Sequence, residues 1–135
     1  SIYEGTTQLQ TVAAIRYVTT GAYLNQIRAY EAQPCAPELE GLKARLKEMA
    51  DRFAAVTNEV NELKNQEFQD FVARRLVEMA AFTIMGHLLV QEATTAPELF
   101  AKSANVYVRH AEAEVEKHFN FIRKFQPEDL DNYRK

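Results

Sequence analysis

Three histidines are the first candidates for chemistry in this 135-residue chain. On a helix, His110, Glu114 and His118 would lie at i, i+4 and i+8 on one face, where they could hold a metal ion between helices. The di-iron pattern of helical bundles requires a glutamate three residues before a histidine, and none of the three histidines has one. Polar residues at this spacing more often line a partly solvated helix flank, so no metal site is predicted.

Two further reactive side chains are predicted to be structural. His87 lies beside the apolar face of its predicted helix, and a buried histidine with a hydrogen-bond partner is the simplest interpretation. Gly86 before it is expected to allow close helix packing. Cys35, the only cysteine, lies in a proline-bounded loop with no histidine near it in sequence, so a free thiol is expected rather than a nucleophile or a disulfide.

The densest polar motif is IYEGTTQLQ, in residues 2–10. It combines an apolar-aromatic pair, the carboxylate of Glu4, a glycine that allows unusual backbone angles, and Thr6 and Thr7, either of which could cap a helix beginning near Gln8. A carboxylate just before a helix also stabilises the helix dipole. The residues alone therefore favour a capped helix start over a catalytic glutamate, and both interpretations remain open.

The apolar spacing of residues 37–63 predicts a long amphipathic helix. Apolar side chains recur alternately after three and four residues, the repeat of a helix packed on other helices. They are Leu39, Leu42, Leu46, Met49, Phe53, Val56, Val60 and Leu63. The repeat loses its phase around residues 64–66, where Asn65 is predicted to cap the next helix.

Two more long helices are predicted downstream. The second runs to about residues 94–97, because Pro97 disfavours helix in the residue before it and suits a first helical turn. The third begins at Pro97 and continues to Gln126, where Pro127 stops it.

A shorter helix is predicted upstream over residues 22–32, after a break at Gly21 and before a loop over residues 33–37. Helices joined by short connections pack antiparallel to their neighbours, so we expect an all-α fold, an up-and-down antiparallel bundle of about four helices. The expected divisions are a motif-bearing loop over 1–10, an N-terminal helical segment over 7–32, the bundle over 38–126 and a polar tail over 127–135.

Composition excludes several functions. Sixteen Lys and Arg against nineteen Asp and Glu give a net charge of −3, which leaves no excess positive charge for nucleic acid or an anionic membrane. No apolar run approaches the roughly 18 residues of a membrane span, and the first residues lack the basic-then-apolar pattern of a signal sequence, so none is expected. The single cysteine suits a reducing compartment, so a cytoplasmic location is expected. Isolated basic pairs such as Arg74 and Arg75 are expected to be solvated.

Residues 2–10 resemble a motif of the acyl-CoA dehydrogenases, whose last catalytic helices open with Ile-Tyr-Glu-Gly-Thr-x-Gln-Ile-Gln. Only Leu9 differs from that motif. The rest of the chain looks like the additional C-terminal helical domain of the longer bacterial members, matched by helical character. Because the chain begins with Ser1 rather than Met, we expect it to be a fragment of such a protein.

The resemblance implies a parent protein that oxidises an acyl-CoA thioester to a trans-2-enoyl-CoA. In most of that family the glutamate of the motif removes the α-proton while the flavin of FAD takes the β-hydrogen as hydride, and Glu4 matches this base. Gly5 and Tyr3 match positions beside the substrate. The stretch that contacts FAD is matched by Thr6, Thr7 and Gln8.

The resemblance also implies an electron-transfer flavoprotein as electron acceptor and a homo-oligomeric parent. Thr11 stands where many family members have an arginine, and the family's N-terminal helical domain and middle β-domain are not in this sequence. The isolated chain is therefore expected to be inactive and to bind no FAD, with its bundle serving packing or oligomerisation. The alternative is a non-catalytic helical interaction domain in which residues 2–10 only cap a helix.

Overall fold

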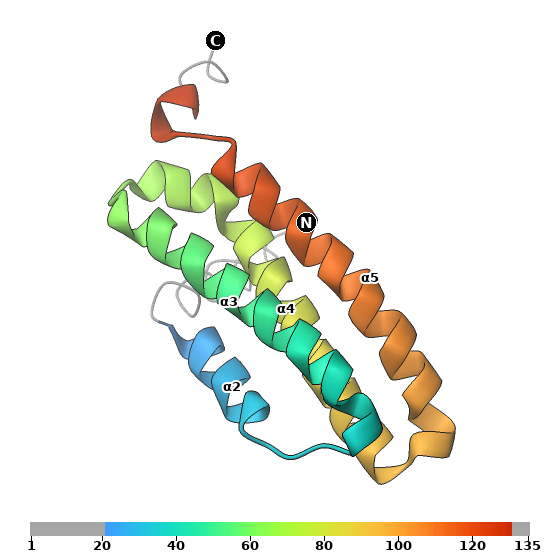
Figure 1. The fold of residues 1–135 in the computed structure, drawn as a ribbon. Helices are drawn as coiled ribbons and strands as arrows, with labels where there is room; N and C mark the ends of the chain where they lie inside the picture. The colour runs from blue at the N-terminus through green and yellow to red at the C-terminus, as the bar shows by residue number, and fades with distance from the viewer. Residues whose placement is uncertain (1–20, 131–135) are drawn as a thin grey trace, which may run out of the picture.

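The computed structural model describes residues 21–130 of the chain. Its helices are α2 (Ala22–Glu31), α3 (Glu40–Glu62), α4 (Gln66–Thr95) and α5 (Pro97–Arg123), with short 3-10 helices η1 (Pro37–Leu39) and η2 (Pro127–Asp129). Figure 1 shows the three long helices packed side by side, with the shorter α2 along α3 and α4. The all-α prediction is confirmed: residues 21–130 form four packed helices and no strand.

Contacts between α2 and α3 show that consecutive helices reverse direction. Arg28 Nη2 of α2 lies 2.9 Å from Asp51 Oδ1 in the middle of α3. Near the end of α2, the carbonyl oxygen of Glu31 accepts a hydrogen bond of 2.9 Å from Lys43, near the start of α3. Residue numbers therefore rise along one helix as they fall along the other, as the up-and-down arrangement predicted.

The core contains the predicted three-four repeat of α3. The buried members are Leu39, Leu42, Leu46, Met49, Phe53, Val56 and Val60. Leu63, predicted in the same repeat, is instead 43% exposed. It is the C-cap residue that follows α3, and it lines an open hollow at this end of the bundle rather than the closed core.

The turn between α3 and α4 has the predicted cap. Asn65 has extended backbone angles, and its side-chain oxygen accepts a 2.9 Å hydrogen bond from the backbone N–H of Phe68. This bond satisfies one of the N–H groups that the first helical turn leaves unpaired. The next boundary also lies where predicted, since α4 ends at Thr95 and Pro97 is the first residue of α5.

The end of α5 differs from the prediction. The helix stops at Arg123, three residues before Gln126. Gln126 is extended, with φ −115° and ψ 160°, because a residue before proline is driven out of the helical region. The segment after Pro127 is not wholly solvated: Leu130 is only 6% exposed and contacts the core.

Gly86 of α4 faces both α3 and α5. A methyl group added at this position would lie 2.5 Å from Leu46 Cδ2 of α3 and 3.6 Å from Val108 Cγ2 of α5. The glycine therefore permits the close helix approach that its place in α4 predicted.

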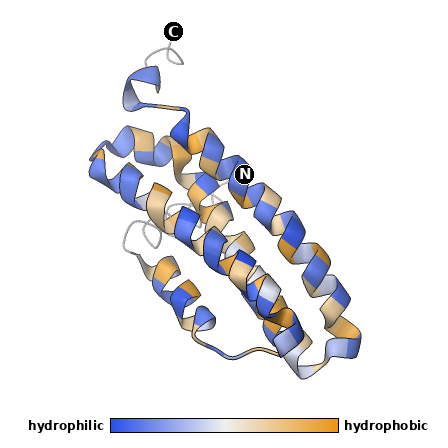
Figure 2. Ribbon diagram, in the orientation of Figure 1, coloured by the Kyte–Doolittle hydropathy of each residue, from blue (hydrophilic) through white to orange (hydrophobic). Residues whose placement is uncertain are grey.

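The helix surfaces are amphipathic. Figure 2 shows hydrophilic and hydrophobic residues on each helix, with no helix apolar all round. Within residues 21–130, no helix is both long and apolar enough to cross a membrane.

Candidate functional site

The residues predicted to do chemistry from the motif lie outside the described part of the chain. These are Tyr3, Glu4, Gly5, Thr6, Thr7 and Gln8. The described chain begins at Gly21, whose φ of 83° is left-handed, immediately before the first residue of α2. This supports the predicted break at Gly21, since glycine adopts that conformation without steric cost.

The three polar residues that could have formed a metal site are not brought together. Glu114 Oε2 lies 2.7 Å from Lys117 Nζ, and the bond from Lys117 holds the pKa of Glu114 below its usual value. His110 is exposed and packs edge-on against Phe82, with ring centroids 5.7 Å apart. His118 faces α4. Across residues 21–130, no three His, Cys, Asp or Glu side chains lie close enough together to hold a metal ion.

His118 belongs instead to a buried polar cluster between α4 and α5. It is 3% exposed, and its Nδ1 lies 3.1 Å from Nη1 of Arg75. Because a guanidinium can only donate, Nδ1 is the acceptor and the ring proton is on Nε2. Nε2 lies 2.8 Å from Glu78 Oε2, at an angle that makes no hydrogen bond.

The environment of His118 favours the neutral form of its ring. Burial is the main cause that lowers the pKa of His118, and the charges of Lys117 and Arg75 act in the same direction, opposed by Glu78 and Glu114. A neutral imidazole that accepts from the guanidinium of Arg75 joins α5 to α4.

Arg75 was predicted to be solvated, and that prediction is wrong. Its guanidinium carbon lies 3.4 Å from the centroid of the Phe121 ring on α5, a cation–π contact. The sequence does contain a signal that Arg75 is partly buried. Arg75 is four residues after Phe71, which places both side chains on the flank of α4 beside its apolar stripe.

His87 is the second buried titratable group. It is 1% exposed and stacks on Tyr30 of α2, with ring centroids 6.0 Å apart. The predicted burial is confirmed, whereas the predicted hydrogen bonding is incomplete, because Nε2 has no partner among the described residues. Burial lowers the pKa of His87 to about 4, and the positive charge of Lys43 contributes.

Lys43 caps the C-terminal end of α2. Its ammonium donates to the carbonyl oxygens of Tyr30 at 3.2 Å and Glu31 at 2.9 Å, and also to that of Gln33. Glu31 is the last residue of α2, so its carbonyl is one that the last turn of the helix leaves without an intrahelical partner, and a cation there also complements the helix dipole. Lys43 is therefore a structural residue that ties α2 to the start of α3.

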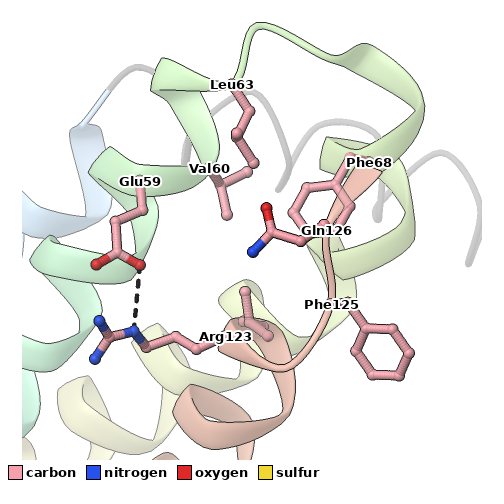
Figure 3. A pocket seen from close by; sticks show the side chains of 8 residues that line it. Glu59, Val60, Leu63, Phe68, Arg123, Phe125 and Gln126 are labelled. Carbon is pink, nitrogen blue, oxygen red and sulfur yellow. Dashed lines mark ion pairs between the residues drawn. The ribbon is translucent and has the colours of Figure 1, made fainter. Parts of the chain in front are cut away.

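A hollow of ≈ 220 Å³ lies at the end of the bundle where α3 ends and α4 begins (Figure 3). An ion pair crosses it, with Arg123 Nε 3.5 Å from Glu59 Oε2. Its remaining walls are mainly the apolar side chains Val60, Leu63 and Phe68. A paired carboxylate and apolar walls offer packing contacts rather than a reactive group.

Residues 19–130 match the sequence model of the acyl-CoA dehydrogenase C-terminal domain. The chain belongs to the acyl-CoA dehydrogenase family. It is also similar to the crystal structure of the acyl-CoA dehydrogenase family protein from Porphyromonas gingivalis, at 46% sequence identity and a TM-score of 0.80. That similarity covers 85% of this chain and 99% of the crystallised one. No curated protein matches the sequence.

The family match and the N-terminal motif are separate observations on this acyl-CoA dehydrogenase domain. The matched region starts at residue 19, after residues 2–10 have ended. The helical domain was expected from helical character alone, and the match now assigns it to the family directly. The motif adds the only group of residues for which the family resemblance implies a catalytic role.

Proposed function

We propose that this chain is the C-terminal part of an FAD-dependent acyl-CoA dehydrogenase, with the catalytic base in residues 2–10 and a helical bundle that serves packing or oligomerisation. One observation carries the proposal: a nine-residue motif over residues 2–10, which differs from the family pattern only at Leu9, lies upstream of a domain of the same family that begins at residue 19.

Glu4 is the proposed base that removes the α-proton of the acyl-CoA thioester. A carboxylate performs this step best in a dry pocket, since burial raises its pKa toward that of the acidified carbon acid and removes competing water. FAD, when bound, supplies the acceptor for the β-hydrogen, which leaves as hydride. The backbone N–H of Glu4 is a suitable donor to the thioester oxygen, where negative charge develops.

The neighbouring residues suit binding. Threonine hydroxyls and a glutamine amide are neutral donors that fit the carbonyl and phosphate oxygens of a flavin nucleotide, which favours Thr6, Thr7 and Gln8 as FAD contacts. Gly5 lets an acyl-CoA substrate approach the backbone, and Tyr3 offers an aromatic wall beside it. An electron-transfer flavoprotein is the proposed acceptor, and the single cysteine supports a cytoplasmic parent.

The test is Glu4→Gln in the parent enzyme. The amide keeps the size of the side chain but cannot take a proton, so flavin should stay bound while turnover falls by about 100-fold to 10,000-fold. Glu116→Gln, at an exposed position of α5, is the matched control and should keep full activity. Unchanged turnover in Glu4→Gln would remove Glu4 as the base.

The isolated 135-residue chain provides a second test. Its motif would form only one edge of a flavin site, so circular dichroism should show helices while a flavin titration shows no binding. A yellow chain with one FAD per protein would contradict this division of roles.

A non-catalytic interaction domain is the second candidate, favoured by apolar side chains on the surface. Leu99 is 74% exposed and Val106 is 63% exposed. The native sequence upstream of Ser1 separates the two candidates. Several hundred residues that include a β-domain would support the dehydrogenase, and their absence would support the interaction domain.

A further inference from the structure

The hollow beside the Arg75–His118 contact has the size and lining of a small-molecule site. It lies between α4 and α5, which run side by side, toward the end of the bundle where α4 begins and α5 ends (Figure 1). Its volume is ≈ 450 Å³, and small-molecule sites commonly occupy about 300–1,000 Å³. Two aromatic rings, those of Phe71 and Phe121, lie in its walls together with charged side chains from both helices. Apolar walls with a few polar groups are the usual lining of a ligand site.

The charges around this hollow leave one cation without a counter-charge. Arg74 Nε lies 3.8 Å from Glu78 Oε1, and Lys117 Nζ lies 2.7 Å from Glu114 Oε2. Arg75 has no carboxylate within ion-pair distance among residues 21–130. Three cations against two carboxylates therefore leave a single positive charge unbalanced, that of Arg75. The hollow suits a ligand with one negative charge.

The guanidinium of Arg75 is already held in position. Its carbon lies 3.4 Å from the ring centroid of Phe121, so the ring covers one face of the group. Its Nη1 donates to His118 Nδ1 at 3.1 Å, and its other N–H groups meet no acceptor within residues 21–130. A guanidinium presents a planar fork of donors that matches the two oxygens of a carboxylate. A fork that neighbouring side chains have fixed loses little freedom when a ligand binds.

A second polar group in the same wall lacks a partner. His118 is 3% exposed, and its Nε2, which carries the ring proton, makes no hydrogen bond within the described part of the chain. Glu78 Oε2 lies 2.8 Å away but outside hydrogen-bond geometry. Buried polar groups in folded proteins nearly always have a partner. An unsatisfied donor beside an unbalanced cation therefore favours an acceptor that comes from outside the chain.

We propose that this hollow binds a small aromatic carboxylate. The carboxylate accepts two hydrogen bonds from the guanidinium of Arg75, and the ring of the ligand packs against Phe71 and Phe121, whose centroids are 6.3 Å apart. A phosphate monoester fits less well, because its charge of about −2 exceeds the one unbalanced positive charge of the hollow. The accessory bundle thus has a ligand site of its own, separate in sequence from residues 2–10.

The first test uses benzoate as the probe. Benzoate is titrated into the isotope-labelled 135-residue chain and followed by NMR, where the Nε–H of Arg75 and the ring of His118 should show saturable shifts. Arg75→Lys keeps the charge but loses the fork, so it should weaken binding at least about 10-fold. Arg123→Lys is the matched control. Arg123 also lies over a ring, that of Phe119 at 5.1 Å, but it is paired with Glu59, so benzoate binding should not change.

The second test has the opposite sign. The carboxylate of Glu78 lies in the wall of the hollow and repels a bound anion, so Glu78→Gln should tighten benzoate binding by about 3-fold. Acetate, which has no ring to pack against Phe71 and Phe121, should bind at least about 10-fold more weakly than benzoate. Circular dichroism confirms that each variant remains helical. The wild-type titration maps the site even if a variant fails to fold.

Three results would overturn the proposal. Benzoate shifts that do not saturate, or that leave Arg75 and His118 unaffected, would mean that the hollow is not a carboxylate site. Equal affinity in Arg75→Lys and the wild type would exclude recognition by the guanidinium fork. Inorganic phosphate that binds at Arg75 more tightly than benzoate would overturn the class of ligand. None of these results bears on Glu4, because the Glu4→Gln test measures turnover and flavin content in the parent.

Discussion

His87 of α4 stacks on Tyr30 of α2, with ring centroids 6.0 Å apart and ring planes at 23°. The stack is where the short helix α2 meets the middle of the bundle, and Lys43 of α3 donates to the carbonyl oxygen of the same Tyr30. His87 therefore lies under α2 beside a cation, 1% exposed, and the folded protein favours its neutral form. A proton added to His87 would be a buried charge beside another positive charge.

The first prediction is a loss of stability in mild acid. The folded pKa of His87 is about 4 and its ordinary value is 6.5. Between these values the unfolded chain binds a proton that the folded chain does not, so the free energy of unfolding falls as pH falls from 6.5 to about 4. The contribution of His87 is up to about 3 kcal/mol. His118, whose pKa is also lowered, adds a loss of the same sign.

Urea unfolding followed by circular dichroism across this pH range measures the loss. His87→Phe keeps an aromatic ring against Tyr30 without a titrating group, so its stability should depend less on pH than that of the wild type. His110→Phe is the control, because His110 is exposed and its replacement leaves the stack in place. An unaltered pH dependence in His87→Phe would show that the ring does not titrate under α2.

The second prediction compares two glycines. Alanine at Gly86 gains about 1 kcal/mol of helix propensity, but its methyl group would meet Leu46 Cδ2 at 2.5 Å, and overpacking costs about 1–3 kcal/mol. We expect Gly86→Ala to lower the free energy of unfolding by about 1 kcal/mol. A methyl group at Gly41 meets nothing within 4 Å, so Gly41→Ala should raise it by about 0.5 kcal/mol.

A double variant identifies the cause of the loss at Gly86. Leu46→Val shortens the side chain that the new methyl group would touch, so Gly86→Ala should be less destabilising in that background, with a coupling of at least about 0.5 kcal/mol. Equal effects of Gly86→Ala in both backgrounds would assign the strain to another neighbour.

The features that the sequence could predict are those determined by near neighbours along the chain. The cap at Asn65 and the helix start at Pro97 depend on the residues beside them, and both lie where expected. The end of α5 is less local. The predicted end at Gln126 lies three residues beyond the observed end at Arg123, because Pro127 excludes only the residue before it from the helix, whereas the helix ends earlier than that.

The contacts that the sequence could not predict join residues far apart in the chain. Arg75 and His118 are 43 residues apart, and only the antiparallel packing of α4 on α5 brings them together. Considered alone, Arg75 is a surface cation and His118 is one member of a polar helix face. The motif around Glu4 is the opposite case, since nine consecutive residues suffice to recognise it, while its geometry lies outside the described residues.

The third prediction concerns the start of α4. Asn65→Ala removes the acceptor for the backbone N–H of Phe68 and should lower the free energy of unfolding by about 1 kcal/mol. Asn58→Ala is the control within α3: its amide only bonds Glu62 on the exposed surface, so the change should stay within about 0.5 kcal/mol. Chemical denaturation measures both, and equal effects would mean that the cap adds nothing.

The fourth prediction tests the α3 repeat with one substitution at two places. Leu46 is fully buried, whereas Leu63 is 43% exposed at the end of the same repeat. Leu46→Ala leaves a cavity facing Gly86 and should lower the free energy of unfolding by about 2–5 kcal/mol. The protein loses both the burial of the removed methyl groups and the packing around the space they leave. Leu63→Ala removes the same atoms from a surface position and should cost less than about 0.5 kcal/mol. Phe53→Ala should resemble Leu46→Ala. The same atoms are removed in the two leucine variants, so the difference between their losses in free energy of unfolding measures the effect of burial. Losses of equal size would contradict the end of the packed repeat at Val60.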